Sequence, residues 1–134
     1  MRSLKSICAV LICLAIAAPV SARPSLRDVP EIEDPLFAVA VAHVLRERCP
    51  ELEGKELKGI AILWGLRAKA NRMGYSDQEI IEYVRSDAEK ERFWEKGRAL
   101  LRAYGPIDDT ASYCAMGRDE IQKNSAIGAL LRAK

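Results

Sequence analysis

Cys49 and Cys114, 65 positions apart, constrain the fold of this 134-residue chain more than any other feature. Cys49 follows an apolar helical run and precedes Pro50, whereas Cys114 lies near the start of the last long run. In an oxidising compartment, a pair of cysteines indicates a disulfide. A bridge here would close the intervening segments into one covalent loop and stabilise the fold by about 4 kcal/mol.

The first 22 residues predict a secretory signal peptide. Two basic residues precede an apolar run at positions 7–18, and small residues at positions 20 and 22 favour cleavage before residue 23. A permanent membrane helix needs roughly 20 apolar residues, so we expect no stable membrane anchor after cleavage. Cys8 and Cys13 would leave with this segment. The mature protein is therefore expected in the periplasm or outside the cell.

Charge and motifs exclude several classes of partner. Removing residues 1–22 also removes Arg2 and Lys5, which leaves 19 basic and 19 acidic residues. A chain with balanced charge has no built-in attraction to phosphate backbones or anionic lipid, so no nucleic-acid partner is expected. The sequence contains neither a Gly-rich phosphate loop nor a C-x-x-C-H haem motif. We expect no cofactor and no metal.

Helix-start signals predict an all-α fold. Ser76 to Glu79 form a capping box, and Asp34 followed by Pro35 is typical of a first helical turn. Apolar residues recur at helical spacing throughout, and no run alternates as a strand does. The expected helices span 34–49, 55–73, 76–86, 86–104 and 108–121, with a terminal helical turn at 126–131. The sequence thus predicts a compact bundle of five to six short helices with one disulfide.

We predict a single helical domain over residues 34–134, preceded by a flexible leader at 23–33. The leader contains two prolines and several charges and has no apolar period. The second helix is the expected centre of the bundle, because its middle is apolar around much of its circumference. Its predicted buried stripe consists of Leu57, Ile60, Ala61, Trp64 and Ala68. A glycine inside the fourth helix, Gly97, suggests a close helix crossing.

Residues with catalytic potential are sparse. His43 is the only histidine, and Glu47 lies one helical turn after it, so the two form a possible polar site. A zinc site needs three or four protein ligands, which favours a surface histidine paired with a carboxylate. Acidic pairs at 51/53, 108/109 and 119/120 lie at or beside expected helix starts, where negative charge is favourable without a catalytic role.

Four aromatic residues form a possible ligand-lining set. They are Trp64, Phe93, Trp94 and Tyr104. Large aromatic side chains can line a groove for a small molecule, but packing in a core or at its rim is their commoner use. Both interpretations remain open from the sequence.

Several short strings together resemble an uncharacterised family of small exported bacterial helical proteins, classed as a domain of unknown function. The strings are Arg48-Cys49-Pro50, Gly74-Tyr75-Ser76 with Glu79-Ile80, Tyr113-Cys114, Gly117 with Glu120-Ile121, and Ser125 to Leu131. The resemblance implies a periplasmic helical domain with a two-cysteine frame and no known activity. Some members carry a label that makes them a component of NADH dehydrogenase. A component of that kind needs four thiolates around a two-iron cluster, so we read the label as proximity to respiratory-chain genes.

Three functions follow as expectations. The first is a non-enzymatic protein that binds an unknown protein partner or acts as an envelope accessory factor. The second is a carrier with an aromatic-lined cavity for a small ligand. The third, which the sequence supports least, is a hydrolase that uses clustered carboxylates.

Overall fold

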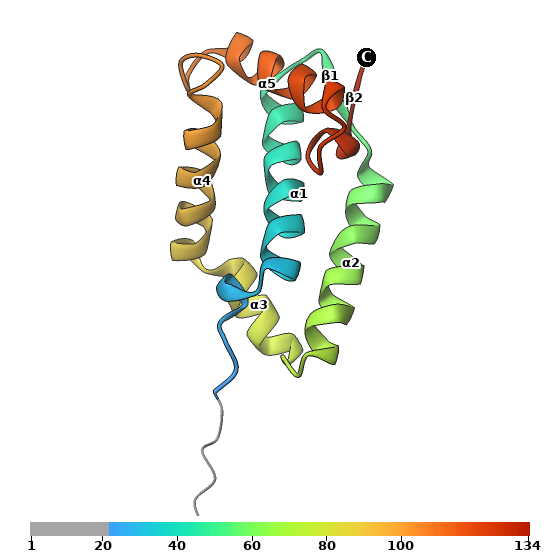
Figure 1. The fold of residues 1–134 in the computed structure, drawn as a ribbon, viewed down its shortest axis with the longest axis vertical. Coiled ribbons are helices and arrows are strands. Elements are labelled where there is room, and N and C mark those ends of the chain that lie inside the picture. Colours follow the sequence, from blue (N-terminus) through green and yellow to red (C-terminus); the bar gives the residue numbers. More distant parts are fainter. Residues whose placement is uncertain (1–21) are drawn as a thin grey trace, which may run out of the picture.

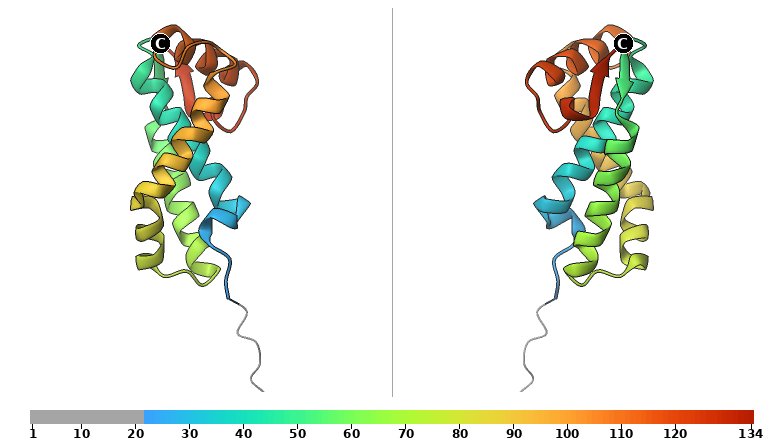
Figure 2. Two further views of the ribbon diagram at one scale, coloured as in Figure 1. Left: turned by 90° about the vertical axis from the view of Figure 1, so that its left-hand side faces the viewer. Right: turned by 90° about the vertical axis from the view of Figure 1, so that its right-hand side faces the viewer.

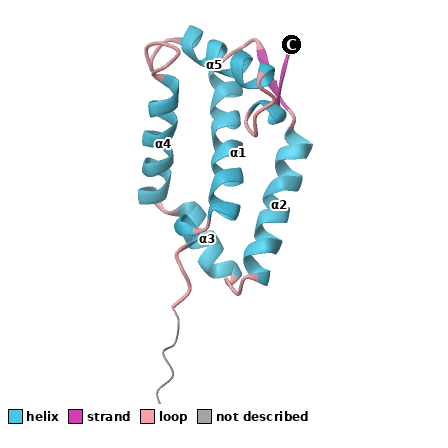
Figure 3. Ribbon diagram, viewed as in Figure 1, coloured by secondary structure: helices cyan, strands magenta, loops and turns pink. Residues whose placement is uncertain are grey.

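The computed structural model describes residues 22–134. The predicted signal peptide lies outside this part, apart from its last residue. Five α-helices and two short 3₁₀ turns confirm the all-α bundle, with one small pair of strands added (Figure 3). The elements are η1 (Leu26–Asp28), α1 (Pro30–Arg48), β1 (Leu52–Gly54), α2 (Glu56–Arg72), α3 (Asp77–Arg85), α4 (Asp87–Leu101), α5 (Thr110–Gln122), η2 (Gly128–Leu130) and β2 (Leu131–Ala133). None of the described helices has the length and apolar character needed to cross a membrane.

Helix α1 occupies the middle of the fold, with α4 on one side and α2 on the other (Figure 1). The short helix α3 joins the lower ends of α2 and α4 in that view. Helix α5 crosses the opposite end, where the two strands also lie, and the side views in Figure 2 show the same end capped. The bundle therefore consists of three long helices closed by a short helix at each end.

Local capping chemistry explains where three helices begin. The Ser76 hydroxyl accepts a hydrogen bond from the Glu79 backbone N–H at 3.1 Å, and the Ser76 N–H donates to the Glu79 carboxylate at 2.7 Å. This confirms the predicted capping box. Ser86 caps α4 in the same way, and Asp109 caps α5 by accepting from the Ala111 N–H at 3.0 Å.

The stretch at 23–33, expected to be a flexible leader, is folded onto the domain. Helix α1 begins at Pro30 rather than near Asp34, and Pro35 lies inside it. Leu26, Val29 and Ile32 are buried in a second core cluster with Ala70 and Tyr75. These apolar residues show no helical period because charges and prolines separate them, yet each fills a space beside α2 and α3.

The centre of the bundle also differs from the prediction. Helix α1, not α2, is central, and its Phe37, Val41 and Leu45 belong to the main core with residues of α4, α5 and the strands. The predicted stripe of α2 faces away from that core, as described below. Gly97 does not mark a close crossing, because a Cβ placed there would have nothing within 4 Å.

The end of the chain forms a strand instead of continuing the expected helical turn. After the 3₁₀ turn η2, β2 pairs antiparallel with β1, with Leu52 opposite Ala133 and Gly54 opposite Leu131. Each strand has only three residues. The alternation that identifies a strand needs a longer run, so the sequence alone did not predict this pair.

The disulfide between Cys49 and Cys114 is present, with an S–S distance of 2.02 Å. It ties the end of α1 to α5 inside the main core, where Cys49 is 0% exposed and Cys114 is 4% exposed. The predicted covalent loop therefore encloses β1, α2, α3 and α4.

Candidate functional site

An exposed apolar strip on α2 is the surface feature that the core does not explain. We define the α2 strip as Leu57, Ile60, Ala61, Trp64 and Ala68. The Leu57 side chain is 85% exposed, Trp64 is 63% exposed and Ile60 is 50% exposed. Scattered exposed apolar residues are ordinary on a protein surface, whereas a contiguous set commonly marks an interaction site.

Helical periodicity explains why these residues face outward together. They recur at spacings of three and four, which places them along one side of α2. The opposite side carries Ile62, Leu66 and Ala70, which pack towards the two core clusters. Helix α2 therefore has two apolar faces, and only one of them is covered by this chain.

Charged residues beside the strip are held by their own chain. The Arg67 guanidinium lies 5.5 Å from the centre of the Trp64 ring and pairs with the Asp77 carboxylate at 2.6 Å. Hydrogen bonds from Arg67 and Asn71 lower the pKa of Asp77 below its usual value. Lys58 Nζ donates to the Ala129 carbonyl oxygen at 3.0 Å. The strip is thus an apolar surface with fixed polar margins.

A second apolar feature is a groove of about 220 Å³ between α1 and α4. Phe37 and Phe93 meet there edge to face, with ring centres 5.4 Å apart, and Trp94 and Gly97 also line it. Of the four predicted ligand-lining aromatics, only Phe93 and Trp94 line this groove. Trp64 lies in the α2 strip.

Tyr104, the fourth predicted aromatic, follows the end of α4, and its hydroxyl donates a hydrogen bond to the Asp119 carboxylate. That hydrogen bond is the main reason why the pKa of Tyr104 lies above its usual value. The structure therefore gives Tyr104 a partner on α5 and brings only half of the predicted set together.

The possible polar site on α1 is split in the structure. His43 and Glu47 are both exposed, but the Glu47 carboxylate lies 3.1 Å from the Arg46 guanidinium, which also reaches Glu56 at 2.5 Å. His43 instead borders a shallow groove between α1 and α2, where Ile60 also lies. The expected pairing of histidine and carboxylate is replaced by an arginine with two carboxylates.

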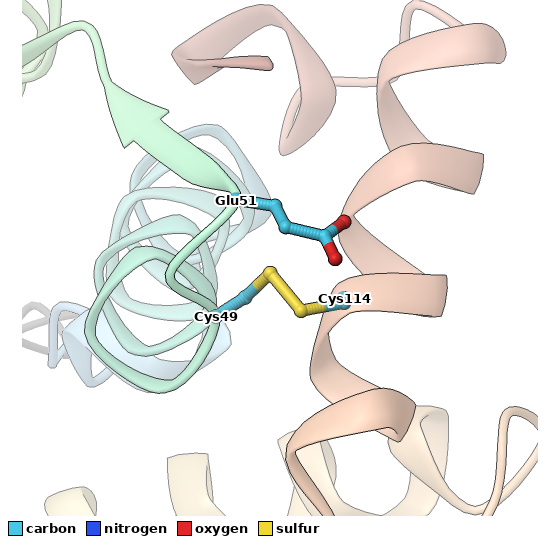
Figure 4. Close-up of side chains that lie close together, drawn as sticks. All are labelled: Cys49, Glu51 and Cys114. Atoms are coloured by element: carbon cyan, nitrogen blue, oxygen red, sulfur yellow. A yellow bond between two sulfur atoms is a disulfide. The ribbon is translucent and has the colours of Figure 1, made fainter. Parts of the chain in front are cut away.

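The acidic pairs considered for hydrolysis also have basic partners. Glu51 lies 2.5 Å from Arg118, and Glu53 lies 2.8 Å from Arg132. Figure 4 shows the Glu51 carboxylate beside the Cys49–Cys114 bridge. Metal binding by cysteine requires the thiolate, and both sulfurs are used in the disulfide, so this group of three is not a metal site in the oxidised protein.

A buried ionic cluster joins α1, α3 and α4. The Glu33 carboxylate is 5% exposed, accepts a hydrogen bond from the Tyr83 hydroxyl and lies 2.6 Å from the Arg92 guanidinium. Arg92 also pairs with Glu89 at 2.8 Å, and Glu89 pairs with Arg27. Glu33 borders none of the main pockets, so the cluster is suited to holding helices together rather than to acting on a substrate.

Sequence reasoning missed this cluster. Its members are up to 65 positions apart, and Glu33 was placed in the expected leader. The available signal was Glu33 next to Ile32 inside a run that continues into Leu36 and Phe37. A carboxylate in an apolar helical run requires a partner when it is buried, and no local residue supplies one.

Comparison with known proteins adds a family but no activity. Residues 24–132 match a protein family described as "Family of unknown function (DUF5333)". No curated protein and no solved structure matches the chain.

Proposed function

This chain belongs to the family of unknown function DUF5333, and we propose that it is an exported, non-enzymatic protein that binds another protein through the α2 strip. In this proposal it acts in the cell envelope as an accessory factor. The exposure of Leu57, Ile60 and Trp64 on one face of a well-formed helix carries the proposal. A helix with an unpaired apolar face is suited to bind an apolar helix of a partner.

The energy available at this face is large enough to matter. Fully burying a leucine or isoleucine side chain yields about 1.5–3 kcal/mol. Leu57 and Ile60 are each at least half exposed in the free chain. A partner that covers them with Trp64 would gain this free energy without unfolding any part of the bundle.

The disulfide supports export. Bridges of this kind persist mainly in oxidising compartments such as the periplasm, and Cys49 and Cys114 are bonded here. The signal-peptide pattern at 1–22 points to the same destination. A link with respiratory-chain genes remains a prediction from the family resemblance, and in that case the protein would assist assembly or contact rather than transfer electrons.

Site-specific photocrosslinking in intact cells tests the proposal. A photoreactive phenylalanine analogue replaces Trp64 in one variant and Glu91, a polar residue on α4 whose side chain is 64% exposed, in a control. We expect a crosslinked protein product from position 64 and none from position 91. Adding Leu57→Glu to the first variant should abolish the product. Equal crosslinking from both positions, or none from either, would refute the proposal.

The groove between α1 and α4 favours a second candidate, a carrier of a small apolar ligand. Its lining is mainly apolar, and Gly97 leaves space beside Phe93 and Trp94. Native mass spectrometry of periplasmic protein should then show a bound molecule that the variant Gly97→Leu loses, because the new side chain fills the groove. Protein that is empty in every preparation would exclude the carrier.

A further inference from the structure

We propose that the partner of the α2 strip is the α2 strip of a second copy of this chain, with the two helices packed antiparallel about a two-fold axis. This inference rests on the proposed function, because it uses the same binding face, and it names the occupant. Four strip residues, Leu57, Ala61, Trp64 and Ala68, are spaced by four, three and four positions. This is the spacing of a coiled-coil seam.

The sizes of the seam residues favour an antiparallel pair. A two-fold axis perpendicular to the helices reverses the order of the seam, so Leu57 lies opposite the partner's Ala68 and Ala61 lies opposite the partner's Trp64. Each large side chain then meets a small one, which is how well-packed layers interdigitate. In a parallel pair, leucine would meet leucine and tryptophan would meet tryptophan, and gaps would remain between the alanines.

The space beside the seam permits close approach. A Cβ placed on Gly65 would have nothing within 4 Å, and the same holds for Gly59. Helices approach closely where small residues leave the backbone bare. The backbone of α2 around Gly65 is therefore open to the side chains of a partner helix, including the stem of the partner's Lys58.

The charges are compatible with this pairing. Arg67 and Lys58 flank the seam on opposite edges, and the antiparallel order staggers each of them from its own copy by about 13 Å along the axis. That distance exceeds the Debye length of about 8 Å at physiological salt. In addition, Arg67 is paired with Asp77, and Lys58 is hydrogen-bonded to its own chain. The equal numbers of acidic and basic residues after position 22 add no overall repulsion.

The position of α2 leaves room for a second copy. It forms one edge of the three-helix layer, with α1 on its inner side only (Figure 1). Pairing two edges would extend the layer, and the seam covers about three helical turns. This is a small interface, so we expect a dimer that depends on protein concentration.

Cysteine crosslinking tests the pairing and its direction. The single variants Leu57→Cys and Ala68→Cys are prepared separately, since the native cysteines are bonded and buried. After mild oxidation, we expect a disulfide-linked dimer from the mixture and only monomer from either variant alone. Dimers from each variant alone would show a parallel pair and overturn the inference, as would a mixture that remains monomeric.

Sedimentation analysis provides a second readout. The wild-type protein should shift from monomer to dimer as its concentration rises, and Trp64→Glu should remain monomeric with an unchanged urea midpoint. Leu100→Glu, at an exposed apolar residue on α4, serves as the matched control and should still dimerise. A monomeric wild type that still gives a crosslink to a different protein from position 64 would overturn self-pairing and leave the proposed function intact. Loss of both signals would remove both proposals.

Discussion

The Arg92 guanidinium on α4 lies 2.6 Å from the buried Glu33 carboxylate on α1. Tyr83 of α3 donates a hydrogen bond to the other oxygen of the same carboxylate. Three helices that are separate in sequence are thus joined at one charged group. Direct packing between α1 and α4 is open along their groove, so this pair supplies a specific link that apolar contact does not.

Replacing Glu33 with alanine should lower the free energy of unfolding by about 3 kcal/mol, because breaking a buried ion pair leaves its partner uncompensated. Glu33→Gln should cost less, since an amide oxygen can still accept the hydrogen bond of Tyr83. Urea denaturation at pH 7 measures both. Glu47→Ala, at an exposed carboxylate paired with Arg46, is the control and should change the stability by less than about 0.5 kcal/mol. Equal losses at the two positions would contradict a structural role for the cluster.

Stability should fall at alkaline pH, and Tyr83 should account for part of the fall. Burial, followed by the hydrogen bond to Glu33, raises the pKa of Tyr83 above its usual value of 10.0. The folded state therefore keeps this proton when the unfolded state loses it, so the stabilisation is complete below pH 10 and is lost as pH rises further. Tyr83→Phe should be less stable at pH 7 and should have a flatter profile above pH 10.

Urea midpoints between pH 7 and pH 11 measure this effect. Tyr104, whose pKa is also raised through Asp119, leaves a remaining slope in the single variant, and Tyr104→Phe combined with Tyr83→Phe should reduce it further. A slope above pH 10 that is the same in wild type and Tyr83→Phe would contradict the assignment.

The parts of the fold that depend on local chemistry were predictable from the sequence. The caps at Ser76, Ser86 and Asp109 each act within three residues, so their signals are complete in a short window. The disulfide was also predictable, since only two cysteines remain after the predicted cleavage. Five helices in approximately the right places follow from these signals.

The side of a helix that meets the core was not predictable. The stripe through Leu57 and Trp64 has the pattern of a buried face, but periodicity does not reveal whether the covering surface belongs to the same chain. The partners of Glu33 were equally hidden, because Tyr83 and Arg92 are 50 and 59 positions away. Long-range pairing of polar groups leaves no periodic trace in a single sequence.

Breaking the disulfide should destabilise the protein by about 4 kcal/mol, since the bridge closes a long loop and restricts the unfolded chain. Comparing urea midpoints with and without reductant, after reduction in denaturant, measures the loss. Under native conditions we expect no free thiols, because Cys49 is fully buried in its bond to Cys114. Two reactive thiols in the folded mature protein would contradict the bridge.

Gly97→Ala should raise the free energy of unfolding by about 1 kcal/mol, because glycine is unfavourable inside a helix and the new Cβ has nothing within 4 Å. The matched control is Gly128→Ala, where a Cβ would overlap the backbone carbonyl of Glu120 and should destabilise the protein. Both are measured by urea denaturation. If Gly97→Ala were destabilising, α4 would have to lie closer to α1 than the structure places it. The groove that supports the carrier would then be closed, whereas the α2 strip, on the other side of α1, would be unaffected.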